Sequence, residues 1–395
     1  MSSDAELLAR YVPFLQYDSL EAYPADSVGV MTDCVPAGHP RGNTLNRLWK
    51  STLAAAEPAA GQLKLEPGLL RAKRYGSDGG PKVRAGDHLD AVGKRYVEDA
   101  REMHARAGYA DQVYGYANRN QPSALWLQYW LFYYYNDKAL LGSGRHEGDW
   151  ELVQIKIDAG EQPVTVTYSQ HTSGELCDWD DVEKQDGAPV VYVARGSHAC
   201  YFRPGIYPQA PIVPDINDNE GPRVQPNLNL IDDDHPDWVA WPGRWGSTRH
   251  WRILRFLGAD SPPGPAQHMA WEDPHRFHLE AHESARLVPM AGADLARPGQ
   301  PLLTAEREGD HAVVSYRLPH PGPAEPKAER ILLSLDGHKD GLPPATYSYE
   351  ARAGGEEITL PLELEDRPYT VRAAAAAKNG ITSPAASVEL PAPAS

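Results

Sequence analysis

The chain has little cysteine, phenylalanine and positive charge for its 395 residues. Its three cysteines, Cys34, Cys177 and Cys200, have no metal-type spacing and predict no disulfide framework. The 38 basic residues against 54 acidic ones give a net charge of −16, and without a basic stripe this excludes nucleic acid as a partner. The sequence has five Phe, 20 Tyr and 10 Trp. This aromatic content is too high for a disordered chain, and the excess of Tyr and Trp over Phe indicates amphipathic, partly solvated sheet surfaces.

Long hydrophobic runs are also absent. No stretch approaches the ~18 apolar residues that a membrane span requires, so we expect no transmembrane segment. Residues 1–11 lack the basic region and apolar run of a secretory signal. We therefore expect a soluble protein that is cytoplasmic, or exported without a recognisable signal peptide, and a peripheral membrane contact stays open.

The pattern of apolar residues predicts a mainly β protein. The aromatic run 125–135 is expected to form a strand buried on both faces. Shorter runs bounded by turn residues predict strands at 150–157, 163–169, 189–195 and 251–257. No helices alternate regularly with them, which favours an antiparallel β-sandwich over a parallel sheet. Peripheral helices are expected at 45–56 and 94–107.

Proline-rich stretches at 261–266 and 297–301 predict a linker zone. They divide the chain into a β-sandwich domain at 1–295, with helical N-terminal insertions, and a smaller domain at 301–395. Strands expected at 312–317, 330–335, 346–351, 357–362 and 369–373 have sandwich spacing. The segment 362–384 resembles the last strands of a fibronectin type III domain. That resemblance makes Tyr369 the tyrosine-corner residue, although this part of the chain has no Trp.

The densest group of polar residues is His146-Glu-Gly-Asp-Trp-Glu, preceded by Asp137. Alternation along a strand places Asp149 and Glu151 on one face, where two carboxylates repel unless a cation or a donor neutralises them. His146, in the expected preceding loop, and Asp137, at the end of the aromatic strand, can reach the same point. Three carboxylates and one imidazole suit Ca²⁺, Mg²⁺ or Mn²⁺, with calcium or magnesium preferred, and zinc is disfavoured without a thiolate.

The acidic pair also has a purely structural interpretation, in which Asp149 and Glu151 cap turns or pair with Arg145 and Lys156. Two histidines at the ends of other predicted strands favour a functional site. The candidate ligand-binding residues are Trp150, Tyr135, His171 and His198, and the candidate catalytic residues are His171 and His198.

Two further groups contain residue types that ligate metal ions. Asp215, Asp218 and Glu220 offer oxygen atoms for a second calcium ion, although the acidic loops that contain them are typical of solvated surface. His278 and His282 are one helical turn apart in sequence, but without a Glu beside the first His they favour a solvated helix face over a zinc site.

Several motifs occur in an order that resembles the vacuolar protein sorting-associated protein 62 family over about residues 5–280. These motifs lie at residues 11–13, 129–137, 146–151, 168–171, 189–199 and 241–246. A more distant resemblance is to the necrosis-inducing cytolysins, whose signature reads Gly-His-Arg-His-Asp-Trp-Glu. Residues 145–151 keep its first His, its Asp, its Trp and its Glu, whereas Arg145, Glu147 and Gly148 replace the other three positions.

The cytolysin resemblance implies that His146, Asp149, Glu151 and the upstream Asp137 hold a divalent cation beside a pocket for a sugar headgroup. We therefore favour cation-dependent recognition of a sugar or lipid headgroup, with a toxin-like or membrane-surface action. A metal-dependent hydrolase that uses the same acidic and histidine residues is an alternative. A structural or trafficking protein without catalysis is a second alternative, and the sequence leaves it open whether the protein is an enzyme.

Overall fold

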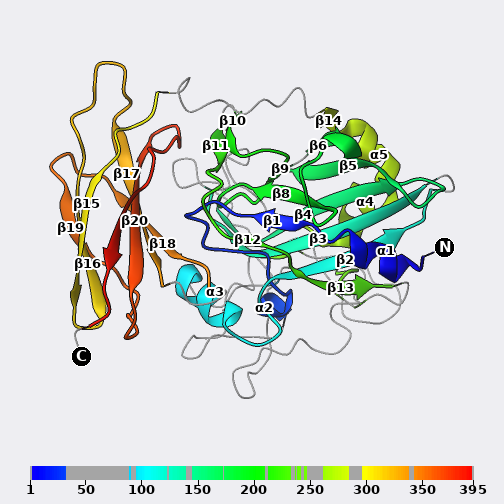
Figure 1. Ribbon diagram of the computed structural model, residues 1–395, viewed down its shortest axis with the longest axis horizontal. Coiled ribbons are helices and arrows are strands. Elements are labelled where there is room, and N and C mark those ends of the chain that lie inside the picture. Colours follow the sequence, from blue (N-terminus) through cyan, green and yellow to red (C-terminus); the bar gives the residue numbers. More distant parts are fainter. Residues whose placement is uncertain are drawn as a thin grey trace, which may run out of the picture.

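The computed structural model consists of two β-rich bodies that lie side by side along the long axis of the molecule (Figure 1). It describes residues 2–32, 89, 95–121, 124–138, 145–171, 173–209, 212–232, 236, 238–241, 244–246, 261–283, 296–337 and 342–393. The helix predicted at 45–56 and the strand predicted at 251–257 lie outside these residues. The fold is mainly β, as the sequence predicts. No helix in this part of the chain is long and apolar enough to cross a membrane.

The larger body contains a sheet that has seven strands within the described residues, in the order β13-β2-β3-β4-β5-β6-β14. Its strands are β2 (Gln112–Asn118), β3 (Leu125–Asn136), β4 (His146–Ile157), β5 (Pro163–Gln170), β6 (Ser173–Asp178), β13 (Asn227–Ile231) and β14 (His282–Glu283). Neighbouring strands are antiparallel except at the two edges, where β13 pairs with β2 and β14 with β6 in parallel.

Strand β3 is buried on both faces, which confirms the prediction from its aromatic run. Trp130 and Phe132 pack on one face in the same core as Trp150. Tyr129 and Leu131 pack on the opposite face in a second core. Because successive side chains of a strand point to opposite faces, the sheet requires a covering layer on each side.

A second, smaller sheet covers one face of the large sheet. Its strands are β1 (Phe14–Gln16), β7 (Lys184–Gln185), β8 (Ala188–Val193), β9 (Cys200–Tyr201) and β12 (Arg223–Val224), and the hairpin of β10 (Gly205–Gln209) and β11 (Ile212–Asn217) follows β9. Leu15, Val191 and Val193 lie in the same core as Tyr129. The pairing of β1 with β8 is parallel, so the sandwich is mainly rather than wholly antiparallel.

Helices and short helical turns lie around the sandwich. They are α1 (Asp4–Arg10), α2 (Gly29–Thr32), α3 (Tyr96–His104), η2 (Trp179–Asp181), η3 (Pro265–Gln267), α4 (Met269–Glu272) and α5 (Pro274–Glu280). Met103 of α3, Ala270 of α4 and Phe277 of α5 join the core on the second face of the large sheet. Helix α3 confirms the helix predicted at 94–107, although it begins later, at Tyr96, and ends earlier, at His104.

Two expectations are corrected here. Helix α5 ends at Glu280 and His282 begins β14, so His278 and His282 do not share a helix face. Residues 261–266, part of the predicted linker zone, pack against the larger body, because Ser261 is fully buried and the backbone carbonyl of Pro262 accepts a hydrogen bond from Trp245 N at 2.9 Å. Proline and glycine predicted the break in regular structure correctly, but they do not reveal whether an irregular segment packs against a core.

The C-terminal body is a fibronectin type III-like sandwich of two sheets. One sheet contains β15 (Leu302–Glu308), β16 (His311–Arg317) and β19 (Glu356–Thr359), and the other contains β17 (Ala328–Asp336), β18 (Ala345–Glu350), β20 (Tyr369–Ala377) and β21 (Ala386–Leu390). Tyr369 is buried, and its hydroxyl accepts a hydrogen bond from Glu365 N at 3.0 Å. The predicted tyrosine corner is therefore confirmed.

Candidate metal and ligand site

The predicted site lies at the end of the β3–β4 pair. His146 is the first residue of β4 rather than part of a preceding loop, because the ladder with β3 continues as far as the Asn136–His146 pair. Asp149 is opposite Tyr133 and Glu151 is opposite Leu131. Both carboxylates are buried, on the face that the smaller sheet covers.

Gly148 explains one departure from the cytolysin motif. Its φ is +62°, a conformation that L side chains rarely adopt. A Cβ atom at this position would lie 1.8 Å from the backbone carbonyl oxygen of Trp245. The second histidine of the motif therefore has no room in this chain, and the strand end is built around glycine.

Asp149 is the best-connected carboxylate of the predicted set. Its Oδ2 accepts hydrogen bonds from Asn136 Nδ2 at 2.8 Å and from His198 Nδ1 at 3.0 Å, and its Oδ1 accepts one from Trp150 N at 3.1 Å. Burial raises the pKa of this carboxyl, but the hydrogen bond from His198 and the nearby His146 hold the pKa below its ordinary value. Asp149 is therefore ionised.

His198 reaches Asp149 from the turn between β8 and β9. The imidazole is fully buried and stacks on the Tyr133 ring, with ring centroids 4.0 Å apart. Its Nε2 atom lies 3.8 Å from Glu21 Oε1, which is within ion-pair range but too long for a hydrogen bond. Burial lowers the pKa of His198, but the contacts with Asp149 and Glu21 outweigh burial and raise that pKa to about 9. His198 is therefore an imidazolium at neutral pH.

Glu151 has no such cationic partner in the part of the chain that the structure describes. Its Oε2 accepts a short hydrogen bond from Ser169 Oγ. Burial, together with the negative charge of Asp149, raises the pKa of Glu151 well above its ordinary value. In this acidic pair, the negative charge of Asp149 is therefore balanced by His198, whereas the Glu151 carboxyl needs a proton or another cation.

The other two predicted metal ligands are engaged in different contacts. Asp137 Oδ1 pairs with Arg145 Nε at 2.8 Å, and both side chains are more than one third exposed. His146 Nδ1 lies 2.8 Å from Gly148 O. Asp137 and His146 lie at the ends of β3 and β4, whereas Glu151 lies opposite Leu131 in the middle of β3. Among the described residues, the group whose ligand atoms all lie within 4.8 Å of one another is a different one.

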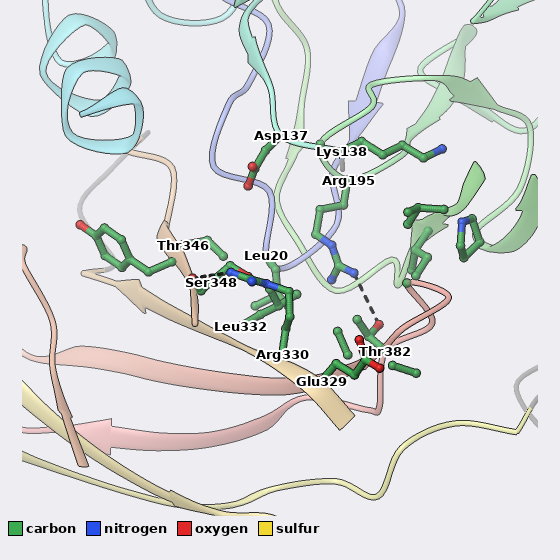
Figure 2. Close-up of a pocket in the computed structure, with 18 of the residues that line it drawn as sticks. Leu20, Asp137, Lys138, Arg195, Glu329, Arg330, Leu332, Thr346, Ser348 and Thr382 are labelled. Atoms are coloured by element: carbon green, nitrogen blue, oxygen red, sulfur yellow. Dashed lines mark hydrogen bonds between the residues drawn. The ribbon is translucent and has the colours of Figure 1, made fainter. Parts of the chain in front are cut away.

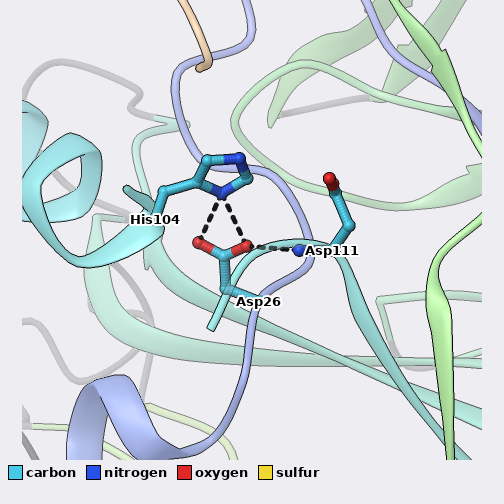
Figure 3. A group of neighbouring side chains, drawn as sticks. All are labelled: Asp26, His104 and Asp111. Atoms are coloured by element: carbon cyan, nitrogen blue, oxygen red, sulfur yellow. Dashed lines mark hydrogen bonds and ion pairs between the residues drawn. The ribbon is translucent and has the colours of Figure 1, made fainter. Parts of the chain in front are cut away.

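That group is Asp26, His104 and Asp111 (Figure 3). His104 Nδ1 lies 2.8 and 3.0 Å from the two carboxylate oxygens of Asp26, and Asp111 N donates to Asp26 Oδ1 at 3.0 Å. Burial raises the pKa of Asp111 to about 6. The three residues are too far apart along the chain to form a spacing motif, so sequence reasoning missed them. Glu21 was missed for the same reason.

The predicted ligand-binding aromatic residues differ in exposure. Trp150 is a core residue, packed against Trp238 with ring centroids 5.6 Å apart, so the prediction that it contacts a ligand gains no support from its position. Tyr135 is half-buried and stacks on Tyr96 of α3 at 3.8 Å. Side chains alternate along a buried strand, and the sequence alone does not say which face opens to solvent.

His171 belongs to a separate polar network around Asp215. His171 Nε2 lies 2.9 Å from Asp215 Oδ2, Lys138 Nζ donates to Oδ1 at 2.5 Å, and Tyr201 OH donates to Oδ2 at 2.7 Å. Burial opposes ionisation of Asp215, but the hydrogen bond from His171 and the charge of Lys138 lower its pKa. With Ser197 Oγ as a further donor, this carboxylate is already neutralised, which argues against the second calcium site weighed from the sequence.

Comparison with known proteins supports the resemblance over part of the chain. The family profile of vacuolar protein sorting-associated protein 62 matches residues 127–216, which include most of β3 and all of β4, β5 and β8. The chain is similar to that family over this segment. No curated protein matches the chain.

Several solved structures show distant similarity. NLPPya in complex with glucosamine is 14% identical, with 43% of this chain and 68% of that chain covered and a TM-score of 0.28. The FN5 domain of Drosophila Lar is 19% identical, with 24% of this chain and 99% of that domain covered and a TM-score of 0.18. The alpha chain of the chicken interferon gamma receptor is 14% identical, with 25% of this chain covered and a TM-score of 0.21. The present chain spans about half the length of that receptor chain.

Proposed function

We propose that the protein recognises a sugar or lipid headgroup with the help of a divalent cation, Ca²⁺ or Mg²⁺. The observation that carries this proposal is the burial of Asp149 and Glu151 side by side, with His198 as the imidazolium that contacts Asp149. Two buried carboxylates with one monovalent partner leave Glu151 uncompensated when ionised. A divalent ion would satisfy both, and carboxylate oxygens are the ligands that calcium and magnesium prefer.

The four predicted ligands offer the types of donor atom that such an ion prefers, but their side chains must rearrange to reach a common ion. Asp149 and Glu151 would hold the ion from one face of β4, and His146 and Asp137 would complete the site from the ends of β4 and β3. Recruitment of Asp137 requires its pair with Arg145 to open, which costs little because exposed ion pairs contribute at most about 1 kcal/mol. When bound, the ion would supply an open coordination position for hydroxyl or phosphate oxygens of the ligand.

Calorimetric titration of the full chain with Ca²⁺ and with Mg²⁺ tests the cation directly. We expect Asp149→Asn to weaken binding of the preferred ion at least about 10-fold, because it removes a charged ligand. Asp178→Asn is the matched control, since Asp178 is an exposed carboxylate at the end of β6. Absence of binding by either ion to the unmodified chain contradicts the proposal, as does equal binding by both variants.

Headgroup recognition requires a separate assay. Amino sugars are reasonable first probes, since one of the similar structures is a glucosamine complex. Glucosamine binding is measured with the preferred ion and again in EDTA, and dye release from vesicles tests the toxin-like, membrane-surface action. Sugar binding that survives EDTA unchanged contradicts the role of the cation.

A second candidate function is metal-dependent hydrolysis, favoured by the His171–Asp215 pair. The His171 side chain is 34% exposed and its Nε2 is oriented by a buried carboxylate, an arrangement typical of a general base. His198, the other catalytic candidate, is fully enclosed. Hydrolysis of phosphodiester, ester and glycoside substrates, with and without EDTA, tests this function. Turnover that is lost in Asp149→Asn and in EDTA supports it, and no turnover on any substrate contradicts it.

A further inference from the structure

A cavity of about 570 Å³ lies between the two bodies of the chain (Figure 2). Glu21, Asp137 and Arg195 line it from the larger body, and Arg330 of β17 and Ser348 of β18 line it from the C-terminal body. Asp137 is one of the predicted metal ligands, and Glu21 contacts His198. The volume is typical of a site for a small molecule, and the cavity adjoins the predicted cation site.

The two walls of this cavity are fixed to each other by direct contacts. Tyr347 OH of β18 donates a hydrogen bond to Glu98 Oε1 of α3 at 3.1 Å. Val97 of α3 packs against the core of the C-terminal body. Arg195 Nη2 donates to Thr382 Oγ1 at 3.5 Å. The C-terminal body is therefore part of the cavity rather than a distant spacer, and a ligand would meet a wall that is already ordered.

The lining carries more positive than negative side chains. It contains six Lys and Arg residues and four Asp and Glu residues. Each of the three cations from the larger body forms an ion pair with a carboxylate. The pairs are Lys138–Asp215, Arg145–Asp137 and Arg195–Asp18. The C-terminal wall supplies the other three, Lys327, Arg330 and Lys378, together with the carboxylates of Glu329 and Glu350.

Arg330 is held in place without a carboxylate. Its Nε donates to Ser348 Oγ at 2.7 Å and its Nη2 donates to Ser348 O at 2.8 Å. In the described part of the chain, the guanidinium forms no ion pair. The neighbouring strand therefore orients one edge of the planar group within the cavity lining, beside Leu332 (Figure 2). A fixed guanidinium in a cavity is well suited to a carboxylate or a phosphate, which it binds through paired hydrogen bonds.

We propose that the cavity binds a sugar that carries a carboxylate or a phosphate, with the anionic group on Arg330. Ser348 and Thr346 on the same wall, and Glu21 and Asp137 opposite, offer partners for the ligand hydroxyl groups. The C-terminal body thus completes the site and selects for negative charge. This inference rests on the proposed function, because it names the ligand class for the same end of the larger body.

The test uses the full chain and three probes of similar size, D-glucuronate, glucose 6-phosphate and D-glucose. We expect both charged sugars to bind more tightly than glucose. Arg330→Gln should weaken the charged sugars by about 10- to 100-fold, since it removes a charge-assisted hydrogen bond, and leave glucose unchanged. The matched control is Arg317→Gln, because Arg317 is exposed on β16 of the other sheet and does not line the cavity.

Vesicles distinguish a lipid headgroup from a free sugar as the source of the same chemistry. Sedimentation with vesicles that contain phosphatidylinositol 4-phosphate, against phosphatidylcholine alone, should show Arg330-dependent binding if the anionic headgroup is the source. Binding of the soluble sugars alone supports the inference equally. Equal affinity for charged and neutral sugars, or full affinity in Arg330→Gln, overturns it.

Repeating the titrations in EDTA and with Asp149→Asn separates this inference from the proposed function. Sugar binding that depends on Arg330 but is unchanged in EDTA supports the inference and contradicts the dependence on a cation. Cation-dependent sugar binding that Arg330→Gln does not alter overturns the inference and leaves the proposed function standing.

Discussion

His198 should make the stability of the larger body depend on pH above neutrality. The imidazolium is fully buried between the Tyr133 ring and the carboxylate of Asp149. Its pKa is about 9 in the folded protein against 6.5 for an ordinary histidine. Raising the pH therefore removes a proton that the folded chain binds more tightly than the unfolded chain does.

The sign and size of the contribution of His198 to the free energy of unfolding follow from these two pKa values. A group with a raised folded pKa stabilises the protein fully below its unfolded pKa, and this contribution is lost as the pH rises through the folded pKa. At about 1.4 kcal/mol for each pH unit between 6.5 and about 9, His198 contributes roughly 3 kcal/mol at pH 6 and almost none at pH 10. Buried carboxyls whose pKa is raised to about 7, such as Asp18 and Glu175, lose their contribution as the pH rises from about 4 to about 7, mostly below the interval in which His198 titrates.

Urea unfolding between pH 6 and pH 10 in EDTA, followed by tryptophan fluorescence, measures this contribution. The unmodified chain should lose roughly 3 kcal/mol more than His198→Gln over that interval. Asp149→Asn provides a second comparison, because it removes the carboxylate that raises the pKa of His198, and should flatten the same part of the curve. Identical pH profiles for the unmodified chain and His198→Gln would refute the conclusion that this histidine is charged.

Three further predictions concern single residues. Gly148→Ala should destabilise the chain by at least about 2 kcal/mol in urea unfolding, because of its φ of +62° and the carbonyl of Trp245; a smaller loss would mean that the strand end adapts. Tyr369→Phe should cost about 1 kcal/mol by removing the tyrosine-corner hydrogen bond, and an unchanged unfolding midpoint would contradict this. Asp215→Asn should cost about 3 kcal/mol or more, since it leaves Lys138 buried without its counter-ion. Its effect should shrink as the pH falls below about 4, because the unfolded chain then takes up a proton at Asp215 that the folded chain, with its lowered pKa, still excludes; a pH-independent difference would count against an ionised Asp215.

The strands were predictable because their signals are local. The aromatic run of β3 and the short apolar runs of β4, β5 and β8 each contain the alternation that a half-buried or fully buried strand requires. The same alternation placed Asp149 and Glu151 on one face. Irregular segments were less predictable, since nothing in the proline pattern of 261–266 indicates that Ser261 is buried beside Trp245.

The site was only partly predictable because its partners come from distant segments. Glu21 lies in an irregular segment after β1 and meets His198 across 177 positions of sequence, without any spacing that links them. The cavity is harder still to foresee, because one of its walls belongs to the fibronectin-like body. Sequence patterns report which residues share a strand face, and they do not report which strand ends meet in space.

Gly148 stands at the position of the motif histidine, and Asp149 beside it contacts His198 from another segment. The strand end has no space for a side chain at position 148, because the carbonyl of Trp245 occupies it. Asp149 nevertheless bonds an imidazole, which reaches it from the turn after β8. That imidazole is enclosed and also faces Glu21, a residue of the cavity wall. A change of charge at Asp149, by proton or by metal ion, would therefore reach the cavity through a single buried side chain, so cation binding and ligand binding are expected to be coupled.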